Sequence, residues 1–226
     1  ARVYLCQENL TDALACAQEV IDSKRFEFMN DSINNVYAYR NLSYIEKMAR
    51  HEYVSSLYVY DLKEGRSDLF FKNLASCECV IAEGRKASIY SGMGQDLDIR
   101  SKNWFETPAG SATEYVNKYM RGTQIPLLKL SEMYLIAAEA SGDIRYLETL
   151  RANRGYATDP LPAGANLQDE ITKEYQKEFI AEGQLFYYYK RRNMAILPIT
   201  STSMNRATYV LPVPDNELEF GNFKQN

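Results

Sequence analysis

Residues 125–140, with the sequence IPLLKLSEMYLIAAEA, decide the fold of this chain. Apolar residues recur in and beyond this stretch at the spacing of one helix face. Gly142 can end the helix, Asp143 can cap the next one, and Gly155 can end that second helix. Residues 127–155 are therefore predicted to form a helical hairpin. Its first helix presents an apolar face of Leu127, Leu130, Tyr134, Ala137 and Ala138.

Residues 1–24 show a second hairpin of the same kind. Asn9 can take the left-handed conformation that ends a first helix, and Thr11 can cap the helix that follows. Small alanines such as Ala13 and Ala17 lie where the two helices would cross. Two short helices joined by a tight turn have the form of a tetratricopeptide unit.

Residues 25–124, between the hairpins, are less regular. A helix is predicted over residues 36–49, and a strand or extended segment over residues 51–62, where β-branched and aromatic residues partly alternate. Residues 83–124 are rich in Gly, Ser, Thr and Asn, which predicts loops. This segment is treated as a loop-rich insertion.

Residues 125–218 contain the second hairpin, a long helix predicted from about Asp169 to Arg191, and an extended tail over residues 208–214. Two prolines exclude that tail from a helix interior. The predicted fold class is mainly α, with tetratricopeptide-like helical hairpins, a loop-rich insertion and little β.

The composition argues against several classes of function. With 26 Lys and Arg against 30 Asp and Glu, the net charge of −4 gives no overall attraction to nucleic acid or anionic lipid. A single histidine, His51, disfavours histidine-centred catalysis and multi-histidine metal sites. The four cysteines are not spaced as a zinc site, and free, mostly buried thiols are the favoured interpretation.

Several blocks, in order, resemble the SusD/RagB family of glycan- and nutrient-binding lipoproteins at the cell surface of Bacteroidetes. Residues 125–140 are similar to the family's "iPLLRLAEMYLIrAEA", and Asp98-Ile99-Arg100 is similar to its "D.R" element. The remaining blocks are LRANRG (150–155), EYQKEFIAEGQ (174–184), KRR (190–192), YVLPVPDNEL (209–218) and the weaker ARVYLCQENLTDALACAQEVI (1–21). The family is about twice as long, so the resemblance implies that residues 1–226 are the C-terminal portion of a SusD-like domain.

The resemblance also implies a function. The chain would bind an oligosaccharide or related nutrient at the extracellular face of the outer membrane and deliver it to a SusC-like TonB-dependent transporter. A lipid anchor would lie on the missing N-terminal part. The protein would be no enzyme and would need no cofactor. The alternative is a tetratricopeptide-type adaptor that binds proteins without binding glycans.

The loop-rich insertion supplies the candidate ligand-binding side chains. Aromatic faces stack on the C–H faces of sugar rings, while Arg, Asp and Asn hydrogen-bond hydroxyl groups, and small-molecule sites combine apolar walls with a few placed polar groups. The alternative is that these rings pack the insertion onto the helical core. The candidates are Trp104, Phe105, Tyr90, Arg100, Asp98 and Asn103.

Three carboxylates are candidates for acid catalysis, but a structural role is favoured for each. Glu139 is predicted to be buried in mid-helix, with Arg151, Arg154 and Lys190 as candidate partners. Glu178 and Glu182 are spaced i, i+4, as on any charged helix face, whereas glycosidase carboxylates usually flank a cleft from separate elements. No catalytic and no metal-ligating residue is assigned.

Overall fold

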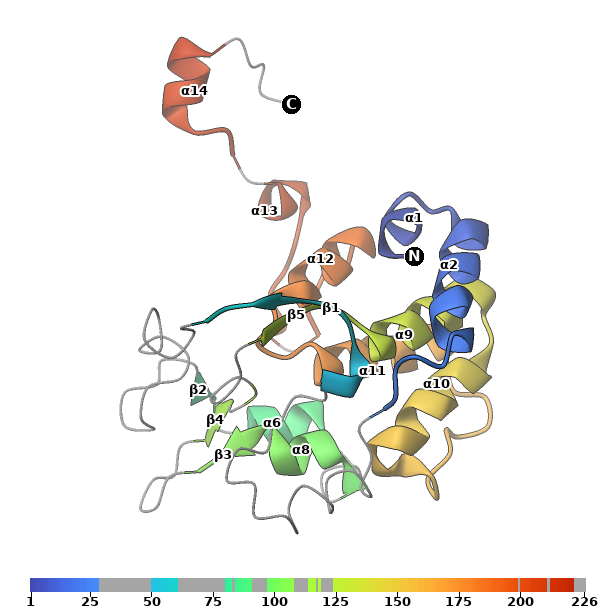
Figure 1. Cartoon of the computed structure of the whole chain (residues 1–226). Helices are drawn as coiled ribbons and strands as arrows, with labels where there is room; N and C mark the ends of the chain where they lie inside the picture. The colour runs from blue at the N-terminus through green and yellow to red at the C-terminus, as the bar shows by residue number, and fades with distance from the viewer. Residues whose placement is uncertain are drawn as a thin grey trace. The chain divides into compact units, whose positions relative to one another are not determined.

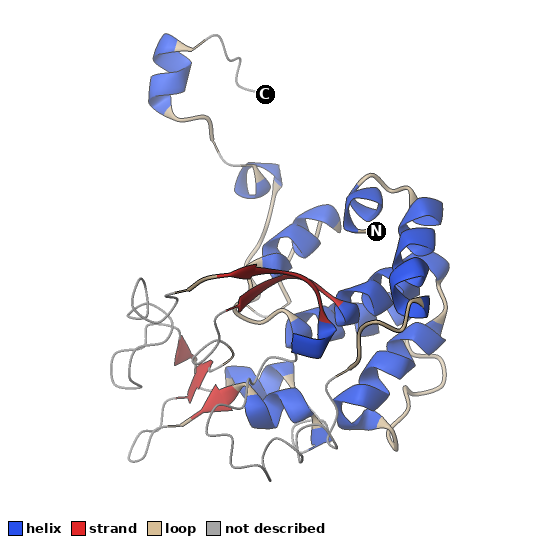
Figure 2. Cartoon of the chain, viewed as in Figure 1, coloured by secondary structure: helices blue, strands red, loops and turns tan. Residues whose placement is uncertain are grey.

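The computed structural model describes residues 1–28, 50–60, 80–82, 84–90, 97–107, 114–116, 118, 124–198, 200–210 and 212–221. Most of these residues are helical, and the strands are short (Figure 2). The chain divides into two compact units, Ala1–Ala181 and Glu182–Asn226. Within the described part, no helix combines the length and the apolar character that crossing a membrane requires.

The two predicted hairpins are confirmed, but Leu127, predicted on the apolar face of the second one, lies in the strand β5 (Gln124–Lys129) and is exposed. The first consists of α1 (Arg2–Cys6) and α2 (Leu10–Asp22), and the second of α9 (Leu130–Ser141) and α10 (Ile144–Arg151). Helix α2 packs along α9, which in turn packs on α10 (Figure 1). Their common core is made of small and apolar side chains: Leu5, Ala13, Ala17, Met133, Ile136 and Ala137. The alanines let the helices approach closely, as in a tetratricopeptide array.

In the second hairpin Gly142 and Asp143 cap the helices as predicted, but α10 ends at Arg151 and not at Gly155. The caps of the first hairpin differ from the prediction. Gly142 is left-handed, with φ of +69°, and the Asp143 side chain accepts a hydrogen bond from the backbone N–H of Arg145. In the first hairpin Glu8, not Asn9, takes the left-handed conformation, with φ of +59°. Asn9 instead caps α2 by accepting from the N–H of Asp12.

The single long helix predicted after the second hairpin is two helices. Helix α11 spans Leu167–Glu178 and α12 spans Gln184–Arg191. Between them Ala181 and Gly183 have φ of +60° and +72°, and a right-handed helix cannot continue through such positions. The apolar spacing runs on across this break, which explains the error.

A short π-helical segment, η2 (Ala152–Tyr156), extends α10 and contains Gly155 with φ of +105°. A Cβ atom at Gly155 would lie 2.2 Å from the backbone oxygen of Leu97. Only glycine allows the insertion to approach the hairpin this closely.

The insertion contributes strands to two small antiparallel sheets. Strand β1 (Tyr53–Tyr58), which follows the short helix η1 (Arg50–Glu52), pairs with β5 (Gln124–Lys129). We call this pair the β1–β5 ribbon. The second sheet has the order β2-β4-β3, from Val80–Ile81, Glu114–Val116 and Phe105–Glu106. The strand predicted within residues 51–62 is thus confirmed.

Residues 83–124 contain more regular structure than the loops predicted for them. Helices α6 (Arg85–Ile89) and α8 (Ile99–Asn103) lie in this segment. Both are five-residue helices, too short to show a helical period in the sequence. The helix predicted at residues 36–49 lies outside the described residues.

In the second unit, α12 is followed by α13 (Arg206–Tyr209) and α14 (Asp215–Phe220). Thr208 and Tyr209, predicted to be extended, belong to α13, because Asn205 caps that turn by accepting from the Thr208 N–H. The Tyr209 hydroxyl donates to the backbone oxygen of Met194 at 2.8 Å.

The lone histidine and the first two cysteines lie near the surface. His51 is exposed. Cys6 and Cys16 are free thiols, but Cys6 is exposed rather than buried. Cys77 and Cys79 lie outside the described residues.

Candidate functional site

Five of the six candidate ligand-binding side chains are buried. Tyr90, Asp98 and Arg100 have no exposed surface, and Trp104 and Phe105 are only 4% and 6% exposed. Asn103, at the end of α8, is half-buried. The ring of Tyr90 meets that of Phe105 edge-on at 5.8 Å between centroids.

Asp98 and Arg100 form a compact unit at the start of α8. Asp98 caps the helix by accepting from the Arg100 backbone N–H at 2.9 Å. The same carboxylate accepts from Arg100 Nε at 2.9 Å and from Nη2 at 2.7 Å. This two-point contact fixes the direction of the guanidinium group, which is directed toward α11.

Arg100 belongs to a buried set of charged side chains, which we call the ion cluster. It joins α8 to α11, η1, η2 and β5. The cluster comprises Glu52, Asp98, Glu174 and Glu178, with Arg100, Lys118, Lys129, Arg151, Arg154 and Lys177.

Glu178, the last residue of α11, is the centre of the cluster. Its carboxylate accepts from Arg154 Nε and Nη2 and from Arg100 Nη1, all at 3.1 Å, and from Ser131 Oγ at 2.9 Å. Arg154 also holds Glu52 with bonds of 2.6 and 2.7 Å. One carboxylate thus ties the insertion, the second hairpin and the start of β1 together.

Two lysines bind the carboxyl end of α11. Lys118 Nζ donates to the backbone oxygen of Glu178 at 2.7 Å, and Lys129 Nζ donates to the same oxygen at 3.1 Å. Both amines are thereby placed at the negative end of the helix dipole. Lys118 Nζ also lies 3.9 Å from the centre of the Trp104 ring, a cation–π distance. The Lys118 amine therefore holds Trp104 in the cluster through the face of its ring.

Glu174 lies one turn earlier on α11 and is surrounded in the same way. Its carboxylate accepts from Arg100 at 2.7 Å, Lys177 at 3.0 Å and Arg151 at 3.4 Å. Lys177 Nζ further donates to the Tyr156 hydroxyl at 3.3 Å.

The cations keep these carboxylates charged. Burial acts to raise the pKa of Glu174, but Arg100 and Lys177 outweigh it and lower the pKa to about 2. Burial likewise acts to raise the pKa of Glu178, and the charges of Arg154 and Lys129 hold it well below its usual range. Groups with such low pKa values carry no proton to donate at neutral pH, which is the opposite of a general acid.

The structure corrects two interpretations of the carboxylates. Glu139 is half-buried rather than buried, and Arg151 and Arg154 pair with the glutamates of α11 instead. Glu178 and Glu182 do not share a helix face, because α11 ends at Glu178. Within the described ranges, no group of three or more His, Cys, Asp or Glu side chains could hold a metal ion.

The cluster shows what the buried candidates do in this chain. Arg100, held by Asp98, cross-links α8 to α11, and the rings of Trp104 and Phe105 are buried. Ligand contact by the six candidate residues stays a prediction. Sequence reasoning missed Glu52, Lys118 and Lys129 because single charges scattered over distant segments carry no pattern.

Sequence reasoning also missed exposed aromatic side chains at the outer end of the β1–β5 ribbon. There Tyr58 and Tyr60 are 66% and 87% exposed. The partial alternation of HEYVSSLYVYDL was the available signal, because it predicted a strand or extended segment here.

Comparison with protein-family models and with curated protein sequences gives no match. Solved structures do match. A SusD superfamily protein from Bacteroides vulgatus ATCC 8482 superposes with a TM-score of 0.64 and 19% identity, over 100% of this chain and 56% of that chain. A SusD superfamily protein from Bacteroides thetaiotaomicron VPI-5482 gives 0.62 and 20%, over 100% and 58%.

A third similar structure was solved with a ligand. It is surface glycan-binding protein A from Bacteroides thetaiotaomicron in complex with laminarihexaose, with a TM-score of 0.63 and 15% identity, over 99% of this chain and 61% of that chain. The chain therefore has the SusD-like fold. It spans between 56% and 61% of the length of these three proteins.

Proposed function

We propose that this chain, which has the SusD-like fold, binds an oligosaccharide or a related nutrient at the cell surface and does not chemically alter it. The observation that carries the proposal is the likeness to surface glycan-binding protein A, whose structure holds laminarihexaose. The ion cluster is consistent with it, since Glu174 and Glu178 are saturated with cations rather than poised for proton transfer.

The proposal extends to the setting of the whole protein. Residues 1–226 form the C-terminal portion of a SusD-like domain at the extracellular face of the outer membrane, held by a lipid anchor. The bound ligand passes to a SusC-like TonB-dependent transporter. Helical-repeat scaffolds present extended surfaces that suit a protein partner, while their loops suit a small ligand.

Isothermal titration calorimetry tests the binding step. The full chain is titrated with laminarihexaose, maltohexaose, cellohexaose and xylohexaose, and at least one of them is expected to bind. An assay for new reducing ends, run for a day with the same oligosaccharides, is expected to show none. Saturable binding without turnover supports the proposal, and turnover would make the chain an enzyme.

The adaptor alternative is favoured by one observation. Val3, Tyr4 and Leu10 on the first hairpin are exposed apolar side chains of the kind that protein interfaces bury. An adaptor would give no heat with any of the four oligosaccharides, yet would bind a protein partner with an affinity that Val3→Ser lowers.

A further inference from the structure

Just beyond the outer end of the β1–β5 ribbon lies Tyr60, the most exposed large hydrophobic side chain in the described part of the chain. Tyr60 is 87% exposed, and Tyr58, two residues earlier, is 66% exposed. Large rings are normally placed to bury apolar surface, and exposed ones gathered on one element mark binding surfaces. Tyrosine suits this use because it offers a wide, rigid face at the entropy cost of only two torsions.

The ribbon places a polar group beside these rings. In the strand register Tyr58 lies directly opposite Gln124, so the two side chains project from the same face. The tyrosine hydroxyls and the Gln124 amide both donate and accept hydrogen bonds. A rigid apolar face beside a few such groups is the usual composition of a small-molecule site.

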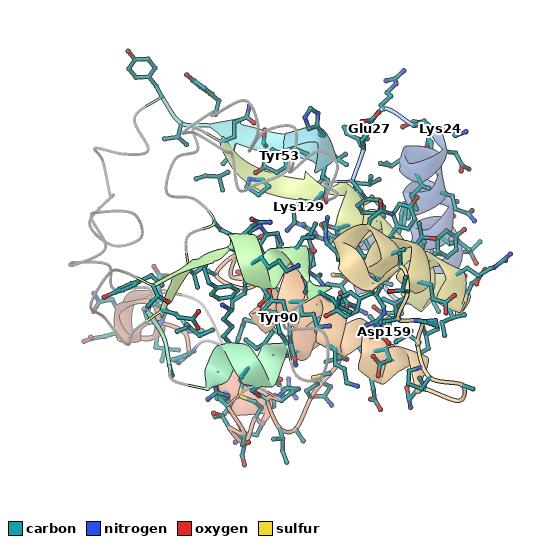
Figure 3. All side chains as sticks on the ribbon, turned by 90° about the horizontal axis from the view of Figure 1, so that it is seen from below. Lys24, Glu27, Tyr53, Tyr90, Lys129 and Asp159 are labelled. Atoms are coloured by element: carbon teal, nitrogen blue, oxygen red, sulfur yellow. The ribbon has the colours of Figure 1, made fainter. Side chains whose placement is uncertain are left out.

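The described residues at the outer end of the ribbon are also uncharged. Residues 53–60, YVSSLYVY, contain no ionisable acid or base other than tyrosine. In β5 the only charged residue is Lys129, which is buried at the opposite, inner end, where it pairs with Tyr53 (Figure 3). These side chains offer no ion pair to an acidic glycan or to a charged peptide, so they fit an uncharged ligand.

The ion cluster fixes the inner end of the ribbon. Glu52, directly before β1, is clamped by Arg154, and Lys129, the last residue of β5, lies 3.2 Å from the Glu178 carboxylate. A two-stranded ribbon alone is only marginally stable in water, so these buried contacts hold the ribbon, and Tyr58 with it, in place. A surface fixed in advance loses less entropy when a ligand binds.

We propose that Tyr58 and Tyr60 at the outer end of the β1–β5 ribbon form a contact site for an uncharged oligosaccharide. The rings stack on the C–H faces of the sugar units, and the tyrosine hydroxyls with the Gln124 amide bond the sugar hydroxyls. The inference rests on the proposed function, since it names the site and the ligand class for that binding.

The test is calorimetric titration of the full chain and its variants with whichever of the four oligosaccharides binds most tightly. Tyr58→Ala and Tyr60→Ala are each expected to weaken binding at least about tenfold, equivalent to about 1.4 kcal/mol. Tyr60→Phe keeps the ring and is expected to stay within about threefold of the unaltered chain. Tyr187→Ala is the matched control, because Tyr187 is also 69% exposed but lies on α12.

The outcomes separate this site from the function itself. If the unaltered chain binds while Tyr58→Ala and Tyr60→Ala bind equally well, the site is overturned and the proposed function stands. If Tyr60→Phe loses as much affinity as Tyr60→Ala, ring stacking is overturned. If the unaltered chain binds none of the four oligosaccharides, both proposals fall. Circular dichroism of each variant confirms that it is folded.

Discussion

Replacing Glu178 with glutamine is the most direct perturbation of the ion cluster. The substitution keeps the size of the side chain but removes the charge at the centre of the cluster. Three guanidinium hydrogen bonds and the Lys129 ion pair then lose their anionic partner. The new amide N–H₂ group would also face donors instead of acceptors, so part of the set is left unsatisfied.

The magnitude follows from burial. Glu178 is 1% exposed, and removing one member of a buried ion pair typically costs ~3–5 kcal/mol. Glu52 remains to hold Arg154, and Glu174 and Asp98 remain to hold Arg100, which places the loss near the lower end, about 3 kcal/mol. For a domain of this size, that corresponds to a fall of about 6–12 °C in Tm.

Thermal and urea denaturation followed by circular dichroism at pH 7 measure the effect. Glu170→Gln is the control, because Glu170 pairs with Lys173, which is 57% exposed, and should lose at most about 0.5 kcal/mol. If Glu178→Gln unfolds with a free energy within about 1 kcal/mol of the unaltered chain, the cluster contributes little net stability. The reasoning that it anchors the insertion would then be wrong.

Three further predictions test the fold. Glu174 has a pKa of about 2 when folded against 4.5 for an unperturbed glutamate, so its contribution to stability is complete above about pH 5 and is lost as pH falls toward 2. Urea midpoints measured from pH 7 down to pH 2.5 should therefore fall, and a flat profile would contradict this. Gly155→Ala should cost at least about 2 kcal/mol, since its Cβ meets the Leu97 oxygen at 2.2 Å, whereas Gly142→Ala, with nothing within 4 Å, should cost about 1 kcal/mol. Equal losses in the two variants would argue against the clash. Asp143→Ala removes the cap of α10 and should lower the urea midpoint in the same denaturation assay, and no change would show that the cap is dispensable.

The hairpins could be predicted because the residues that determine them lie within the hairpins themselves. Helical spacing, Gly142 and Asp143 all lie within the segment that they organise, and the structure uses each as predicted. The break between α11 and α12 could not be predicted in the same way, because apolar side chains keep a helical spacing through residues 179–183. Only the backbone conformation of Ala181 and Gly183 reveals the break.

The site was harder to predict because burial in an irregular insertion depends on distant segments. Trp104 and Arg100 have the residue types of a sugar site, and the sequence around them is that of a loop. Their burial depends on Glu178 and Lys118, which approach from other parts of the chain. The exposure of Tyr60 likewise depends on how the fold is assembled. The sequence therefore suggested that aromatic rings contact the ligand, but not which rings are exposed.

The contacts that hold this fold together join residues far apart along the chain. Arg154 reaches Glu52 across 102 residues, and Arg2 reaches Glu132 across 130. Closing loops of that length costs conformational entropy before the contacts are gained, and high contact order slows folding. We therefore expect the local α9–α10 hairpin to form early and α1–α2 to dock late. The chain should fold more slowly than its helical content alone would suggest.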